Sequence, residues 1–199
     1  SDLGSIPSSL SHLQSLSTFR ALVFRGLLRA VSSCVFRSYF CYSVSFFVLT
    51  VRLEQLNLSH NQLDGSIPPD LGYLSDAISI SLDHNNLTGK IPTNLGRLDD
   101  IAHLSLNHNS FSGTIPTELG SCFRLVGVHL ESNNIDGEIP LELGELSSLE
   151  TLRLESNKMV GVTVPTEICD LLDDNLSVLA ADCSKTHSRV ACPCCTECA

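Results

Sequence analysis

Residues 53–76 have the sequence LEQLNLSHNQLDGSIPPDLGYLSD, and the same pattern returns four more times at an interval of 24 residues. The five repeats cover residues 53–76, 77–100, 101–124, 125–148 and 149–172. The ninth position is asparagine in all of them: Asn61, Asn85, Asn109, Asn133 and Asn157. A fixed period of this length is the signature of a solenoid, in which each coil packs only on its neighbours. The period therefore predicts an α/β solenoid with one long exposed surface.

Apolar residues occupy the fourth and sixth positions of every repeat, with a polar residue between them. This alternation predicts one short strand per repeat in a parallel sheet, near 55–58, 79–82, 103–106, 127–130 and 151–154. We expect the Asn amide to be buried where the chain turns, where it can satisfy backbone groups of its own and the neighbouring coil. Glycine at position 13 suits a tight turn. The Leu-Gly pair at positions 19 and 20 is expected to close a short helical turn on the outer side.

The consensus Leu-x-x-Leu-x-Leu-x-x-Asn-x-Leu-x-Gly-x-Ile-Pro-x-x-Leu-Gly, clearest in residues 53–72, resembles the plant-type leucine-rich repeat (LRR) family, which is also abundant in algae. The resemblance covers residues 53–172 and returns in residues 4–10, GSIPSSL. It implies a right-handed superhelix with its parallel sheet on the concave face. It also implies an extracellular or cell-surface protein that binds a protein, peptide or glycan on that face.

The residues expected to contact a ligand are the outward-facing positions of the strands. They are Glu54, Gln55, Asn57, Ser59, Ser79, Ser81, Asp83, His103, Ser105, Asn107, His129, Glu131, Thr151, Arg153 and Glu155. Arg153 is expected to matter most, because it is the only cation on a mainly acidic and neutral face.

The chain contains no nucleophile elbow, P-loop, zinc-protease helix, dinucleotide fingerprint or kinase signature. We therefore predict a non-enzymatic recognition module without a cofactor. Three alternatives stay open: an ectodomain fragment of a membrane receptor, a secreted hydrolase inhibitor, and a structural cell-surface protein. The net charge of −10 argues against a nucleic-acid partner. The chain begins part-way through a repeat, so any signal peptide or membrane anchor is expected outside this fragment.

One stretch breaks the repeat. Residues 1–18 form a partial N-terminal repeat, and residues 19–52 are an apolar insert with five Arg and no acidic residue. Removing 37 residues restores the register, which favours a translated intron. An evolved insertion loop is a second interpretation. A membrane segment is a third, but the longest charge-free run, residues 38–51, is shorter than the roughly 20 residues that span a bilayer. We expect the insert to pack poorly on the solenoid.

Residues 173–199 form a Cys-rich tail. Six cysteines lie in or just before it, and in a secreted solenoid they predict a disulfide-bonded cap over the last coil: Cys169, Cys183, Cys192, Cys194, Cys195 and Cys198. The alternative is a zinc site, because residues 192–198 offer four thiolates, although their spacing differs from that of paired Cys-x₂-Cys motifs. Cys122 replaces a leucine of the repeat and is expected to act as a small buried hydrophobe.

Two further sets of side chains attract a functional interpretation. His60, His84 and His108 share position 8 and are expected to stack about 4.8 Å apart along the sheet. They suit a pH-sensitive or metal-binding patch, or a solvated column copied by duplication; we favour the solvated column and predict no metal site. The sequons predict glycosylation at Asn86 and Asn175, and less readily at Asn57, where a glycan would block the face.

Overall fold

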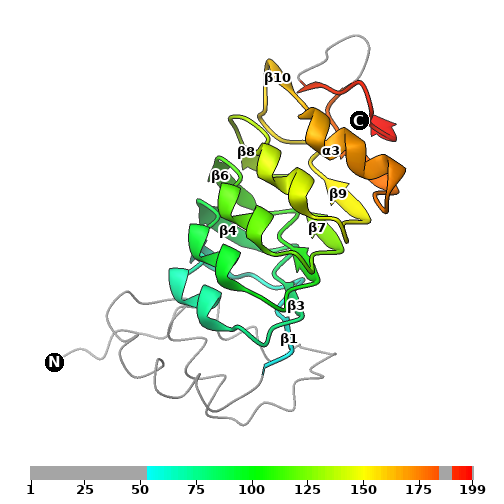
Figure 1. Ribbon diagram of the computed structural model, residues 1–199. Helices are drawn as coiled ribbons and strands as arrows, with labels where there is room; N and C mark the ends of the chain where they lie inside the picture. Colours follow the sequence, from blue (N-terminus) through cyan, green and yellow to red (C-terminus); the bar gives the residue numbers. More distant parts are fainter. Residues whose placement is uncertain (1–52, 184–189, 199) are drawn as a thin grey trace, which may run out of the picture.

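The computed structural model describes residues 53–183 and 190–198, and it shows a solenoid of stacked coils (Figure 1). One side is a seven-stranded parallel sheet in the order β1-β3-β5-β7-β9-β11-β13. Its strands are β1 (Gln55–Asn57), β3 (Ser79–Ser81), β5 (His103–Ser105), β7 (Gly127–His129), β9 (Thr151–Arg153), β11 (Val178–Ala181) and β13 (Glu197–Cys198). Leu56 pairs with Ile80 and Ile80 with Leu104, one repeat apart. The predicted parallel sheet is confirmed. The partial repeat and the insert, residues 1–52, lie outside the described residues.

Short helices cover the opposite side of the coils (Figure 1). They are η3 (Pro69–Tyr73), η4 (Thr93–Arg97), η5 (Thr117–Ser121), η6 (Leu141–Glu145), α3 (Thr166–Asp170) and η7 (Leu171–Asp173). The Leu-Gly pairs lie within η3 to η6, as the repeat predicts. The glycine permits close packing of neighbouring helices: a Cβ atom on Gly120 would overlap the carbonyl oxygen of Glu142. We call this the helical side.

A second parallel sheet joins the two sides. It contains β2 (Asp64–Ser66), β4 (Asn86–Gly89), β6 (Ser110–Gly113) and β8 (Asn134–Ile135). The glycine at position 13 has a positive φ in every repeat, for example 81° at Gly65, which confirms the predicted tight turn. The Pro that follows lies past the strand, where its missing N–H costs no ladder hydrogen bond.

The asparagine ladder replaces hydrogen bonds that a turning backbone cannot make with itself. Asn109 Nδ2 donates to the carbonyl oxygens of Leu82 and Leu106 at 3.0 and 3.1 Å, and Asn109 Oδ1 accepts the Leu87 N–H at 2.9 Å. The same side chain thus bonds to its own coil and the preceding one, as predicted. Full burial was predicted too, but only Asn133 and Asn157 are buried; the other three are half-buried. The hydrogen-bond pattern is nevertheless the same in the buried and the half-buried asparagines, because the backbone groups at the turn need partners in both cases.

Between the two sides runs one hydrophobic core, built from the repeat columns. Leu104, Leu106 and Phe111 are each at most 1% exposed, and the equivalent residues of neighbouring coils pack against them. Cys122 lies in the same core as a free thiol, and burial raises its pKa to about 11. A thiol with so high a pKa stays protonated at neutral pH and behaves as a hydrophobe.

The C-terminal cap, which we define as residues 169–183 and 190–198, departs from the repeat. Its strand β12 (Val190–Ala191) pairs with β10 (Val162–Thr163), and β11 and β13 extend the main sheet. The structure joins its six cysteines as Cys169–Cys194, Cys183–Cys198 and Cys192–Cys195. In this arrangement none of the six is available as a thiolate for zinc. Among the described residues, no helix has the length and apolarity needed to cross a bilayer.

Candidate functional site

The predicted contact residues lie on the outward side of the main sheet, which we call the sheet face. They belong to β1, β3, β5, β7 and β9 or to the residues that immediately flank these strands. All fifteen are exposed or half-buried, while the alternating leucines point into the core. The parallel register brings equivalent positions of successive repeats side by side, so Ser81, Ser105, His129 and Arg153 form one row. Their role in binding stays a prediction.

Charged side chains are unevenly spread over the sheet face. The outward side chains of β3 and β5 include the neutral Ser79, Ser81 and Ser105, and Asp83 follows β3. Around β7, β9 and β13 lies a charged cluster, which consists of His129, Glu131, Arg153, Glu155 and Glu197. Arg153 Nη1 lies 2.9 Å from Glu155 Oε1, and its Nη2 lies 3.1 Å from Glu197 Oε2. The guanidinium is therefore held between two carboxylates.

Glu197 is a member of the charged cluster that the sequence analysis missed. It lies in β13, which pairs with β11 at Ala180, a separation unrelated to the 24-residue period. The position of Glu197 relative to the repeat therefore does not predict its contact with Arg153. The two carboxylates beside Arg153 raise the pKa of its guanidinium, chiefly through the hydrogen bond to Glu155.

Two carboxylates of the charged cluster are only partly satisfied. Within the described residues, Glu131 Oε2 and Glu155 Oε2 are buried and have no hydrogen-bond partner. His129 Nδ1 lies 3.8 Å from Glu131 Oε2, an ion-pair distance but too long for a hydrogen bond. Burial by itself would raise the pKa of Glu131. The interaction with His129 and the positive charge of Arg153 outweigh burial, so the pKa of Glu131 is lowered. Glu131 is therefore an anion at neutral pH with capacity to accept another donor.

The three sequons occupy different surroundings. Asn57 is exposed in β1, and its Oδ1 accepts hydrogen bonds from the Ser59 backbone N–H and hydroxyl at 3.0 and 2.7 Å. Asn86 is exposed at the start of β4, away from the sheet face. Asn175 is exposed in the cap, and its Nδ2, the atom that a glycan would modify, donates to Ser147 O at 2.9 Å. This geometry leaves Asn86 as the sequon that fits glycosylation with least disturbance.

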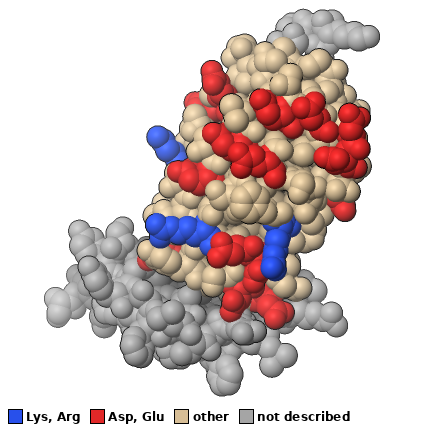
Figure 2. All heavy atoms as spheres, in the orientation of Figure 1, with Lys and Arg blue, Asp and Glu red and all other residues tan. Residues whose placement is uncertain are grey.

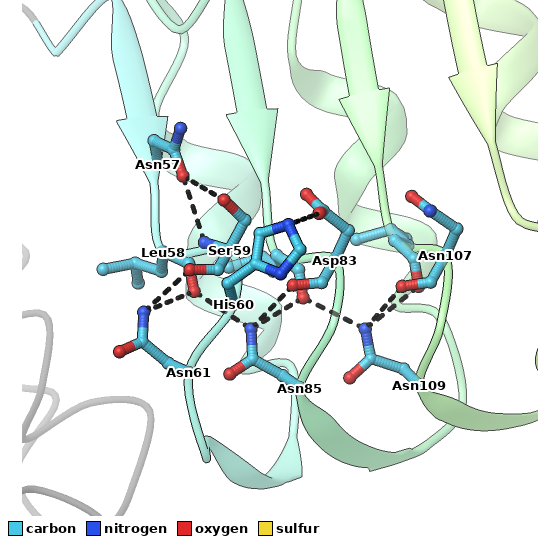
Figure 3. A network of polar contacts seen from close by, with 11 residues as sticks. Asn57, Leu58, Ser59, His60, Asn61, Asp83, Asn85, Asn107 and Asn109 are labelled. Atoms are coloured by element: carbon cyan, nitrogen blue, oxygen red, sulfur yellow. Dashed lines mark hydrogen bonds and ion pairs between the residues drawn. The ribbon is translucent and has the colours of Figure 1, made fainter. Parts of the chain in front are cut away.

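The histidines of position 8 form a column at the end of β1, β3 and β5. The rings of His60 and His84 stack with centroids 4.2 Å apart, and those of His84 and His108 stack at the same distance. All three residues have a positive φ, between 52° and 54°. His60 lies beside the asparagine ladder and approaches Asp83 of the next coil (Figure 3).

The helical side is mainly acidic. Figure 2 shows Asp and Glu side chains spread over the later coils, with a smaller group of Lys and Arg over the earlier ones. Glu118, Glu142 and Glu167 occupy the first turns of η5, η6 and α3. Carboxylates near a helix N-terminus are stabilised by the backbone N–H groups there, which is a structural reason for their position. We therefore assign the helical side no binding role.

Comparison with known proteins identifies the repeat family. The family model for leucine-rich repeats matches residues 52–74, 78–98 and 100–122. No curated protein sequence matches the chain. Solved structures do. The LRR ectodomain of the plant membrane receptor kinase GASSHO1/SCHENGEN3 from Arabidopsis thaliana, in complex with CASPARIAN STRIP INTEGRITY FACTOR 2, is 32% identical with a TM-score of 0.60; the match covers 65% of this chain and 16% of that one.

Two further structures extend the comparison. The Arabidopsis receptor kinase HAESA, in complex with the peptide hormone IDA and the co-receptor SERK1, is 31% identical with a TM-score of 0.61, over 72% of this chain and 26% of that one. A chain of the BIR3–SERK2 complex from Arabidopsis thaliana is 34% identical with a TM-score of 0.56, over 67% of this chain and 71% of that one. The chain thus spans about a quarter or less of the two receptor kinase structures that it matches.

Proposed function

We propose that this chain, which belongs to the plant-type leucine-rich repeat family, is an extracellular recognition module that binds a peptide or protein through its sheet face. The proposal assigns it no catalytic step. Three disulfides favour an oxidising compartment such as the cell exterior. The solenoid supplies a row of strands whose outward side chains vary in chemical type from repeat to repeat, while the core positions stay apolar.

The observation that carries the proposal is the pair of buried carboxylate oxygens, Glu131 Oε2 and Glu155 Oε2, on the sheet face. A buried acceptor without a donor costs about 1–3 kcal/mol, and more when it is charged. These oxygens are closed to solvent, so a ligand that supplies donors recovers this free energy only when the carboxylates rotate toward the surface. Arg, Lys and backbone N–H groups are suitable donors, and a peptide carries all of them. We therefore expect the ligand to place a basic residue against the charged cluster.

A receptor ectodomain is the form of this function that the similar structures favour. Two of them are receptor kinases solved with a bound partner, and the third is a complex between two proteins. A hydrolase inhibitor or a structural surface protein finds no comparable support. The kinase, the membrane anchor and the ligand of a full-length receptor belong to the proposal, because this chain spans only a small part of those proteins.

Selection from a displayed library of random peptides tests the proposal. The immobilised protein, with its disulfides intact, is expected to enrich peptides that contain Lys or Arg. Binding of these peptides should fall by at least about tenfold in the double variant Glu131→Gln, Glu155→Gln, because charge-assisted hydrogen bonds contribute about 1.5–3 kcal/mol each.

The matched control is the double variant Glu118→Gln, Glu142→Gln, which removes the same charge from the helical side. It should bind the selected peptides as well as the unaltered protein does. Equal losses in both double variants would mean that net charge alone attracts the peptides. Failure to enrich any peptide, or loss confined to the helical-side variant, would contradict the proposal.

A further inference from the structure

Three potential metal ligands lie close together at the first two histidines of the column. His60, Asp83 and His84 each offer one ligand atom, and these atoms all lie within 4.8 Å of one another. Asp83 lies beside the stacked rings, with Oδ2 at 3.8 Å from His60 Nε2 (Figure 3). In the five repeats, positions 7 and 8 are Ser-His, Asp-His, Asn-His, Glu-Ser and Glu-Ser. Only the second repeat has a carboxylate beside its own histidine and the histidine of the preceding repeat.

We propose that His60, Asp83 and His84 form a binding site for a divalent metal ion of borderline softness, with zinc as the best fit. Two imidazole nitrogens and one carboxylate oxygen are a donor set that zinc accepts, with water in the fourth position. This proposal revises our preference, based on sequence, for a purely solvated column. It does not depend on the function of the sheet face.

The backbone already holds the three residues in place. The His60 N–H donates to Asp83 O at 3.0 Å, and the His84 N–H donates to Asn107 O at 3.1 Å. Both histidines are therefore tied to the next coil, and the register of β1 with β3 fixes their separation. The side chain of Asp83 is 17% exposed and constrained, while that of His60 is 70% exposed and free to rotate.

Only side-chain rotation separates the observed arrangement from a bound one. Zinc–ligand distances of about 2.0–2.2 Å in a tetrahedron place ligand atoms roughly 3.3 Å apart. His60 Nε2 and Asp83 Oδ2 must therefore approach by about 0.5 Å, and the other pairs of ligand atoms by at most about 1.5 Å. Stacked rings direct their in-plane lone pairs along parallel lines, so metal binding must break the stack of His60 on His84, whose planes differ by 12°. Loss of the stack of His60 on His84 would therefore report metal binding without a measurement of affinity.

The charge of the site also suits a metal. Asp83 supplies a negative charge that a divalent cation neutralises.

Titration calorimetry of the untagged, metal-stripped protein with zinc chloride tests the proposal, after a thiol count has shown the cap cysteines to be oxidised. We expect one equivalent of zinc to bind. His60→Asn and His84→Asn should each weaken binding by at least about tenfold, since even the loss of an outer-shell partner costs about 10–100-fold. Asparagine tolerates the positive φ of these positions, so the variants should fold. The imidazole NMR signals of His60 and His84 should shift together.

His108→Asn is the matched control. It removes the third ring of the column, which is outside the group of three ligands, and should change zinc affinity by no more than about twofold. Asp83→Asn should weaken binding, whereas Asp99→Asn, on an exposed residue of another segment, should not. The proposal is overturned if no stoichiometric zinc binds, if His84→Asn binds as the unaltered protein does, or if His108→Asn loses as much affinity as His84→Asn.

Discussion

The five repeats and the C-terminal cap solve the same problem, holding one coil on the next, by different means. In the repeats, equivalent leucines pack in columns and an asparagine of each coil bonds to the coil before it. The cap contains three disulfides and ends the main sheet at β13. A coil inside the stack buries apolar surface against two neighbours, but a terminal coil has one. Covalent links replace the missing packing there.

The change from repeats to cap is visible in a single residue. In the repeats, the backbone N–H groups of positions 8 and 9 donate to backbone carbonyls of the next coil, as His108 does to Glu131 and Asn109 to Ser132. After the last repeat, the two carboxylate oxygens of Asp182 accept the equivalent N–H groups of Ser156 and Asn157 at 2.8 and 3.0 Å. One carboxylate thus takes the place of two backbone carbonyls. The last repeat is therefore followed by a side-chain hydrogen-bond acceptor and not by a further repeat.

The largest expected effect comes from the core of the repeats. Leu104→Ala should lower the free energy of unfolding by about 2–5 kcal/mol, because it leaves a cavity among residues that other coils hold in place. Leu104 is 1% exposed in the middle strand of the five. Chemical denaturation monitored by circular dichroism measures the loss. A loss below about 1 kcal/mol would show that neighbouring coils collapse into the cavity, and that the repeats are looser than their packing suggests.

The disulfides of the cap should differ according to the length of the loop that each one closes. Cys169–Cys194 spans 25 residues and Cys192–Cys195 spans 3. The chain-entropy relation gives about 3.5 kcal/mol for the first and about 2 kcal/mol for the second. Replacing each pair with serines and comparing thermal melts measures both. If the short-range disulfide proves the more important, local geometry and not loop entropy stabilises the cap.

The ladder should contribute less per residue than the core. Asn109→Leu is expected to destabilise the protein by about 1–3 kcal/mol, because the carbonyls of Leu82 and Leu106 and the N–H of Leu87 lose their partner. Asn109→Asp keeps the acceptor and removes the donors, so its effect separates the two roles. An unchanged melt for Asn109→Leu would refute the ladder as a stabilising element.

The contrast between the two regions also explains what the sequence could predict. The strand, the turn glycine, the Leu-Gly helix and the asparagine hydrogen bonds follow from one repeated pattern, and the structure has all of them. In the cap the hydrogen-bonded neighbours lie 27 residues apart between Ser177 and Glu150, and 17 apart between Thr196 and Leu179. No period relates these separations to the repeat. The roles of Asp182 and Glu197 therefore had no sequence signal.

The candidate sites divide in the same way. The outward positions of the sheet face follow from strand alternation, so each of them could be placed from sequence. Which of them pair could not be predicted, because pairing depends on rotamers and on the cap. Arg153 shows the consequence: its place on the sheet face follows from the repeat, but its contacts with carboxylates of its own strand segment and of β13 do not. The histidine column was predicted from the repeat period alone. The contact between His60 and Asp83 follows only when the register of neighbouring coils is known.

The smallest effect concerns the one ion pair that, among residues 53–183 and 190–198, connects the repeats to the cap. Arg153 is 30% exposed and Glu197 is 53% exposed, so solvent screens their attraction, and such pairs contribute about 0.2–1 kcal/mol. A double-mutant cycle with Arg153→Gln and Glu197→Gln should give a coupling free energy within this range, and 1 M salt should reduce it. Glu155 is the internal comparison, because it contacts the same guanidinium from within the repeat at 2.9 Å. Its coupling to Arg153 should be the larger of the two, since its side chain is only 16% exposed.

A coupling above about 2 kcal/mol between Arg153 and Glu197 would mean that the cap is held electrostatically as well as covalently. The boundary between repeats and cap would then be an integral part of the charged cluster.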